Sequence, residues 1–172
     1  IYATGAVSGY IDVGGLIGQV RRSTITNAFA SGNATSPKLV SSQGYSVGGL
    51  FGSVFETGNS TITNCVGLGN ATGSKYVGTT IGYVGMGNVT LKNIYGTGTV
   101  TGDNKYTNAF IGVFDNQNIE ASNRHGGSLA IRNSYYWAGA AKNPTGGSIP
   151  NEAALYGLVY KENQAMLEDD DT

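Results

Sequence analysis

The sequence repeats itself, and this feature limits the possible folds more than any other. A segment built on the pattern STITN, followed by small and hydroxyl residues, occurs at 23–35, 60–72 and 89–101, and in a shorter form at 129–139. A second phrase alternates with it and reads VGGLIG at 13–18, VGGLFG at 47–52, VGTTIG at 77–82 and TNAFIG at 107–112. Its last glycines, at 18, 52, 82 and 112, are 34, 30 and 30 residues apart. Such spacing is typical of stacked repeat units.

The composition favours β structure for these units. Of the 172 residues, 28 are glycine and only 12% are charged, against roughly 25% charged residues in an average soluble domain. Short β-branched or aromatic stretches broken by glycine are typical of strands. We therefore predict an all-β protein, a parallel β-solenoid of about four coils. Each coil should hold three short strands, formed by the Gly-Gly phrase and by the segments before and after the asparagine of STITN.

The end of the chain departs from this repeat. We expect the solenoid to span residues 1–142, and residues 143–172 to form a C-terminal loop, a short capping helix and an acidic tail. The helix is predicted over 151–161, because Pro150-Asn151 resembles a helix start and alanine and leucine follow. It would cover the open edge of the last coil.

Strand alternation predicts which side chains point inward. After Asn27, the small residues Ala28 and Ala30 share one face, which suits a narrow interior. A straight strand would place Ile25 and Ala28 on opposite faces, so the chain should bend near Asn27. Stacked corner asparagines could form an amide ladder, and the equivalent residues are Asn27, Asn64, Asn93 and Asn133. The Gly-Gly phrase has apolar residues on both faces, so its orientation stays open.

The opposite face of the segment after the asparagine offers a candidate partner-binding surface. Its expected outward residues are Tyr2, Phe29, Val66, Tyr95, Thr97 and Tyr135. Aromatic rings beside hydroxyl groups suit a host protein or a glycan, because apolar contact and hydrogen bonding are offered together. The alternative is that tyrosine and threonine are present only because exposed strands favour them.

Catalytic and cofactor sites are not predicted. His125, the single histidine, lies in a polar linker, and Cys65 falls in the inward column. The body's carboxylates lie in or beside linkers, so no rigid carboxylate pair is expected. The glycines precede no expected helix, as a phosphate-binding loop would require. We therefore expect no enzyme activity, no cofactor and no metal.

Charge and hydropathy exclude two classes of partner. No basic cluster is denser than Arg21-Arg22, so we expect no binding to nucleic acid. No apolar run approaches the roughly 18 residues of a membrane span, so we expect no membrane insertion.

The pairing of VGGLIG or VGGLFG with STITN and a following GNAT resembles the GLUG repeat. The resemblance covers residues 1–140. The third copy has Thr79-Thr80 in place of Gly-Leu, and the fourth lacks the glycine pair. GLUG repeats occur in exported bacterial proteins, including adhesins of the filamentous-haemagglutinin type and streptococcal immunoglobulin A metallopeptidases.

The resemblance implies an extracellular location, at the cell surface or secreted. It also implies a non-catalytic adhesion, display or spacer module of a larger bacterial surface protein. The open strand edge at Ile1-Tyr2 further suggests that copies associate end to end. The alternative is an accessory domain that positions substrate for an immunoglobulin-cleaving metallopeptidase whose active site lies outside this chain. Ice binding is a third class, but Asn33 and Asn70 interrupt the Thr-x-Thr register that it requires.

Overall fold

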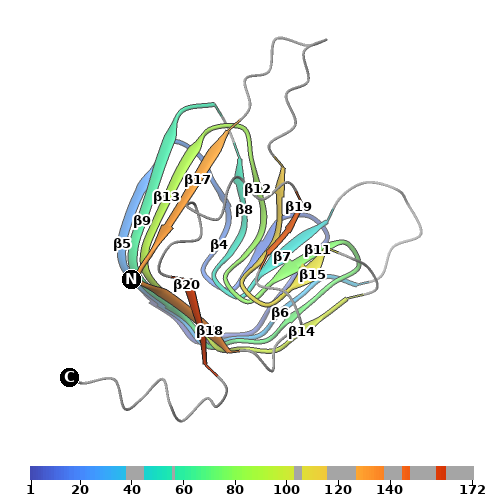
Figure 1. The fold of residues 1–172 in the computed structure, drawn as a ribbon. Coiled ribbons are helices and arrows are strands. Elements are labelled where there is room, and N and C mark those ends of the chain that lie inside the picture. Colours follow the sequence, from blue (N-terminus) through green and yellow to red (C-terminus); the bar gives the residue numbers. More distant parts are fainter. Residues whose placement is uncertain are drawn as a thin grey trace, which may run out of the picture.

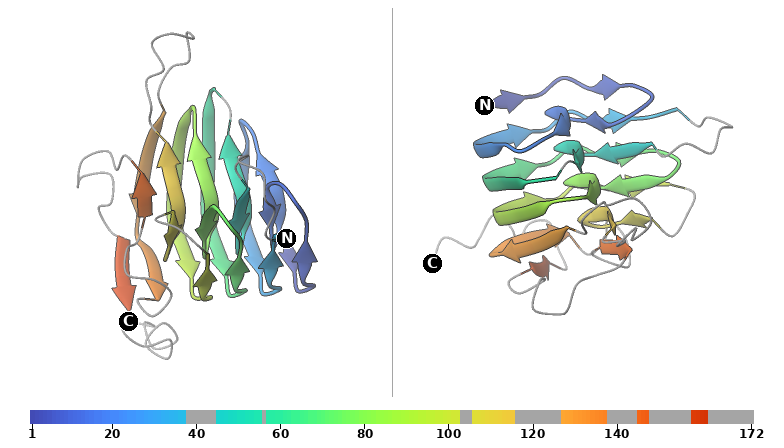
Figure 2. Two further views of the ribbon diagram at one scale, coloured as in Figure 1. Left: turned by 90° about the vertical axis from the view of Figure 1, so that its right-hand side faces the viewer. Right: turned by 90° about the horizontal axis from the view of Figure 1, so that it is seen from above.

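The chain folds as a parallel β-solenoid (Figure 1). A computed structural model describes residues 1–37, 45–55, 57–102, 106–115, 127–137, 145–147 and 158–161. Every regular element within these ranges is a strand. The strands stack in four sheets, and equivalent strands of successive coils pair with one another (Figure 2). The predicted all-β class and solenoid architecture are therefore confirmed.

The strands of the four sheets have the following bounds. Sheet A contains β1 (Tyr2–Ala3), β5 (Thr24–Ala30), β9 (Asn59–Gly67), β13 (Asn88–Gly96), β17 (Ser128–Arg132), β18 (Ser134–Trp137) and β20 (Leu158–Lys161). Sheet B contains β2 (Val7–Ser8), β6 (Ala34–Thr35), β10 (Ala71–Thr72) and β14 (Val100–Thr101). Sheet C contains β3 (Val13–Gly14), β7 (Ser46–Gly48), β11 (Tyr76–Gly78) and β15 (Thr107–Asn108). Sheet D contains β4 (Ile17–Val20), β8 (Phe51–Phe55), β12 (Ile81–Gly85), β16 (Ile111–Asp115) and β19 (Thr145–Gly147).

The prediction of three strands per coil is wrong, because the coils contribute to four sheets. The Gly-Gly phrase divides into a strand of sheet C and a strand of sheet D. The segments before and after the asparagine instead belong to one sheet, since β5 runs through Asn27. Beyond Ala30 the chain turns at Gly32 and continues as β6 in sheet B.

The bend at the asparagine has a backbone cause. Asn27 and Asn64 both have a φ of 54°, and Asn93 has a φ of 55°. This left-handed conformation is uncommon for residues other than glycine, although asparagine is enriched in it. One such residue reverses the alternation of the strand, so that side chains two residues before and one residue after it both point inward. Ile25 and Ala28 are accordingly only 9% and 3% exposed.

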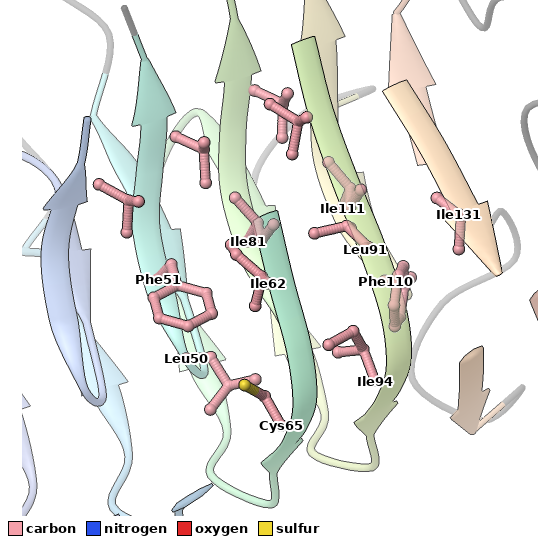
Figure 3. Packing of buried hydrophobic residues seen from close by; sticks show 14 of the residues in the cluster. Leu50, Phe51, Ile62, Cys65, Ile81, Leu91, Ile94, Phe110, Ile111 and Ile131 are labelled. Atoms are coloured by element: carbon pink, nitrogen blue, oxygen red, sulfur yellow. The ribbon is translucent and has the colours of Figure 1, made fainter. Parts of the chain in front are cut away.

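The main core lies between sheets A and D (Figure 3). Sheet A contributes a row of aliphatic side chains, Ile62, Leu91 and Ile131, which point toward Phe51, Ile81 and Ile111 of sheet D. Full burial of one such side chain stabilises a fold by about 1.5–3 kcal/mol. A smaller core between sheets B and C contains Val13, Ala34, Val47, Ala71 and Val77.

The degraded copies of the Gly-Gly phrase are accommodated by buried hydrogen bonds. In the third coil, Thr79 Oγ1 donates to the Ala109 carbonyl at 2.5 Å and Thr80 Oγ1 donates to the Phe110 carbonyl at 2.6 Å. In the fourth, Asn108 Nδ2 donates to the Gly112 carbonyl at 2.7 Å. Each polar side chain thus gains a backbone partner, which removes most of the cost of burying it.

The last glycine of the phrase lets sheets C and D approach each other closely. A Cβ atom on Gly82 would lie 2.4 Å from the Val47 nitrogen, and one on Gly112 would lie 2.5 Å from the Val77 nitrogen. Gly52 is equally crowded, because its Cβ would lie 2.3 Å from the Asp12 carbonyl carbon. This close contact explains why a glycine recurs at this position of the phrase.

The C-terminal helix prediction is wrong over residues 158–161, which form β20 and pair in parallel with β18. The unpaired edge of β18 offers backbone donors and acceptors, and adding a strand satisfies them whereas a helix does not. The remainder of the predicted helix and the acidic tail lie outside the described residues.

Candidate functional site

The corner asparagines lie in one row along the outside of sheet A. Asn64 Nδ2 donates to Asn27 Oδ1 at 3.1 Å, and Asn93 Nδ2 donates to Asn64 Oδ1 at 2.8 Å. Asn133 shares the left-handed backbone, with a φ of 46°. The row joins coils to one another, so its role is structural.

The predicted partner-binding face lies on the same sheet, next to this row. The strand register places Tyr2 beside Phe29, Phe29 beside Val66, Val66 beside Tyr95 and Tyr95 beside Tyr135. The Tyr95 and Tyr135 rings are stacked, with centroids 4.9 Å apart. Tyr2 is 79% exposed, whereas the others are half-buried against their neighbours. The five residues therefore form a continuous surface stripe.

Thr97 does not belong to this face, which corrects the expectation from alternation. Its side chain is only 5% exposed, and its hydroxyl has no hydrogen-bond partner among the described residues. The alternation fails because β13 ends at Gly96 and the chain turns toward sheet B.

A concave surface that the sequence did not reveal lies between the outer sides of sheets C and D. This hollow, which we call the C–D groove, has a volume of about 340 Å³. It is lined by Ile11, Asp12, Gln19, Ser46, Ser53, Phe55, Lys75, Tyr76 and Tyr83. Its lining combines apolar, hydroxyl, amide and charged groups, as small-molecule sites do.

The hollow exists because the second coil has a serine in each of the two sheets that border it. The register of sheet C places Ser46 beside Tyr76, and that of sheet D places Ser53 between Gln19 and Tyr83. The floor of the groove is therefore serine in the second coil. Longer side chains of the first and third coils stand on either side as walls.

The first coil supplies the polar wall. Asp12 Oδ2 accepts a hydrogen bond from Gln19 Nε2 at 3.1 Å, and Asp12 Oδ1 accepts one from Ser46 Oγ at 2.5 Å. Gln19 Oε1 in turn accepts from Arg21 Nε at 2.5 Å. Asp12 has a left-handed φ of 50°, and such conformations cluster at functional sites. The carboxylate and the amide are thus held in fixed orientations.

The third coil supplies two rings of the aromatic wall, and the second coil supplies Phe55. The Tyr76 and Tyr83 ring centroids are 5.3 Å apart, and Phe55 lies 5.9 Å from Tyr83. The Lys75 ammonium lies 4.8 Å from the Tyr76 ring centroid, which is within range of a cation–π contact. Tyr83 OH donates to Asp115 Oδ2 at 3.2 Å. These contacts fix the rings from several sides.

The groove escaped sequence analysis because glycine hides the orientation of its phrase. Both strands that flank the groove come from the Gly-Gly phrase, whose glycines carry no side chain to show an alternation. The available signal was the residue just before each phrase, which changes from Asp12 to Ser46, Tyr76 and Tyr106 along the coils. A change from polar to aromatic at one repeat position marks a surface that differs between coils.

The remaining candidates for chemistry lie elsewhere. Cys65 is buried in the main core, and burial raises the pKa of its thiol. His125 lies outside the described residues. Within the part of the chain that the structure describes, His, Cys, Asp and Glu side chains form no group of three or more suited to a metal ion. No helix in the same part is long and apolar enough to cross a membrane.

Comparison of the chain with protein-family models, with curated proteins and with solved structures found no match.

Proposed function

We propose that this chain is a non-catalytic, extracellular adhesion and display module of a larger bacterial surface protein. The observation that carries the proposal is the C–D groove, a concave surface of mixed chemistry on a rigid stack of coils. The resemblance of the repeat to GLUG sequences supports the location and the bacterial origin.

The arrangement of the groove favours binding over catalysis. Asp12 is the one carboxylate among the described residues that line it, and it already accepts hydrogen bonds from Gln19 and Ser46. A general acid or base needs a proton that it can exchange with a substrate, whereas these contacts hold the carboxylate as a fixed acceptor. The aromatic wall adds contact area with little loss of conformational entropy, which suits recognition.

The parallel stack explains how such a module would work. Each coil contacts only its neighbours, so further coils of the same kind in the larger protein would lengthen the stack into a rod. A rod holds a binding surface away from the cell and also serves as a spacer between other domains. Adhesion and display are thus two uses of the same rigid scaffold.

Attachment assays test the proposal. Beads coated with the purified chain should attach to mucin-coated or matrix-coated surfaces, and beads coated with albumin should not. Attachment to immunoglobulin A alone would instead favour the substrate-positioning role. Failure to attach to any of these surfaces, or hydrolysis of glycan or immunoglobulin that His125→Ala abolishes, would contradict adhesion.

A further inference from the structure

We propose that the C–D groove binds one pyranose ring of a neutral glycan, an inference that rests on the adhesive function proposed above. The ring would lie above the small side chains of the second coil, with its C–H face against the tyrosines and its hydroxyl groups toward Asp12 and Gln19. This assigns a ligand class to the groove and a separate role to each wall.

The size of the hollow matches a small ligand. Its volume of about 340 Å³ lies near the lower end of the roughly 300–1,000 Å³ that small-molecule sites occupy. Ser46 and Ser53 are only 4% and 1% exposed, because Asp12 and Gln19 are hydrogen-bonded to their hydroxyl groups and cover them. The hollow is therefore closed beneath the ligand by these covered serines. The groove is open at the surface, and further sugars of a chain can therefore extend into solvent.

The aromatic wall suits the apolar face of a sugar ring. An aromatic ring has a negative face, which attracts the slightly positive hydrogens of C–H groups. The tilted pair of Tyr76 and Tyr83, with centroids 5.3 Å apart, offers two such rings on one side of the hollow. Phe55 extends the wall beyond Tyr83.

The polar wall suits the hydroxyl groups of the same sugar. The Asp12 carboxylate accepts two hydrogen bonds from the protein, but a carboxylate has about four lone-pair sites and can accept more. Hydrogen bonds to a charged acceptor are the stronger kind. Because Gln19 and Ser46 already fix the carboxylate, binding a hydroxyl requires little further ordering.

The charge balance favours a neutral sugar over an acidic one. Among the described residues on or hydrogen-bonded to the groove, Asp12 and Asp115 carry negative charge, and Arg21 and Lys75 carry positive charge. Nearby charges of opposite sign leave no strong net field for an anion. A sialic acid or a sulfated sugar would also bring its charge close to Asp12.

Saturation-transfer-difference NMR with methyl glycosides of glucose, galactose, mannose and N-acetylglucosamine tests the inference. At least one glycoside should receive saturation from the unmodified chain, with the strongest transfer at ring C–H protons. Ser53→Tyr should remove at least nine-tenths of this transfer, because the new ring fills the hollow. The substitution fits the fold, since Tyr83 occupies the equivalent place in the next coil.

Two further variants locate the binding. Tyr76→Ala should weaken the transfer several-fold by removing one of the three rings of the aromatic wall. Tyr135→Ala, on the surface stripe of sheet A, should leave it unchanged. Circular dichroism of each variant checks that the solenoid is intact. If Ser53→Tyr loses its β spectrum, Ser46→Tyr replaces it as the variant that fills the hollow, because Tyr76 occupies the equivalent place in the next coil.

The outcomes separate this inference from the adhesive function. The groove is not a sugar site if no glycoside receives saturation, or if Ser53→Tyr binds a glycoside as well as the unmodified chain does. If the beads still attach to mucin in that case, the adhesive function stands. Loss of saturation in Tyr135→Ala would also overturn it, by moving the site to sheet A. Conversely, saturation that Ser53→Tyr abolishes supports the sugar site even if the beads fail to attach.

Discussion

At the scale of single residues, asparagine has two tasks at the corner of a coil. Its backbone adopts the left-handed conformation that turns the strand, and its amide joins neighbouring coils. Glycine would serve the first task and not the second, whereas glutamine would place its amide farther out and tolerate the backbone poorly. Asparagine alone combines both, because its short side chain tolerates left-handed φ values.

Substitution of Asn64 should separate the two tasks. Asn64→Ala should lower the free energy of unfolding by about 1–3 kcal/mol, because it removes two hydrogen bonds and places alanine in the left-handed region. Asn64→Gly loses the same hydrogen bonds without the backbone strain, and should therefore cost less. Urea unfolding followed by circular dichroism measures both. If Asn64→Ala and the unmodified chain had the same urea midpoint of unfolding, the ladder would add nothing to stability.

The buried thiol of Cys65 should be inert in the folded chain. Burial raises its pKa, so the reactive thiolate is scarcer than in an exposed cysteine. Iodoacetamide should label Cys65 only after unfolding in urea. Rapid labelling of the native chain would contradict its place in the core.

The same shift predicts a dependence of stability on pH. The folded state holds the thiol proton to higher pH than the unfolded state, so the unfolding free energy should fall as the pH rises above the ordinary pKa of a thiol. Cys65→Ala should remove this part of the slope. The replacement fits, because Ala28 occupies the equivalent position in the preceding coil. If the unfolding free energies of the two proteins changed with pH in the same way, Cys65 would make no contribution to the pH dependence.

At the scale of elements, the Gly-Gly phrase decides the shape of the coil. Its two halves form sheets C and D, which approach each other so closely that only hydrogen fits at Gly82. The fold-back creates the angle in which the C–D groove lies. A bulkier residue at this position would open the angle and disturb the groove as well as the core.

Gly82→Ala should therefore destabilise the chain strongly. Its Cβ would meet backbone atoms at 2.4 Å and 2.7 Å, which cannot move independently of their strands. Such overpacking costs typically about 1–3 kcal/mol, and sometimes more. Gly5→Ala is the matched control, because nothing lies within 4 Å of its added Cβ. Equal melting temperatures for the two variants would contradict the close approach of the sheets.

The sequence predicted those elements in which side chains alternate. After Asn27, Asn64 and Asn93 the small inward residues were assigned correctly, because burial on one face leaves a period of two. The prediction failed at Thr97, where a turn ends the strand, and over 158–161, where local composition gave no information on a distant strand edge. It gave no orientation for the Gly-Gly phrase, so the groove could be found only from the tertiary structure.

At the scale of the whole molecule, the first coil forms one end of the stack. The strands β1, β2, β3 and β4 each stand at the end of their sheet. The coil that they form exposes apolar side chains, with Ile1 and Tyr2 each 79% exposed and Ile11 62% exposed. An edge of this kind pairs readily with another chain.

The purified chain should therefore associate through its first coil as its concentration rises. Sedimentation velocity should show larger species, and Val7→Lys should reduce them, because a charge on an edge strand opposes pairing. Thr72→Lys is the control, since β10 lies inside sheet B with partners on both sides. A chain that remains monomeric at every concentration would contradict self-association.

Because equivalent residues of successive coils pair in register, the gene can gain or lose whole coils. The second, third and fourth copies of the phrase follow one another every 30 residues, and each coil presents its neighbours with the same backbone pattern. Unequal recombination that duplicates or deletes one such unit would preserve every pairing on either side. Each event would alter the length of the rod by about 4.8 Å, the spacing between paired strands. The length of the stack is therefore a quantity that natural selection can adjust by the number of copies alone.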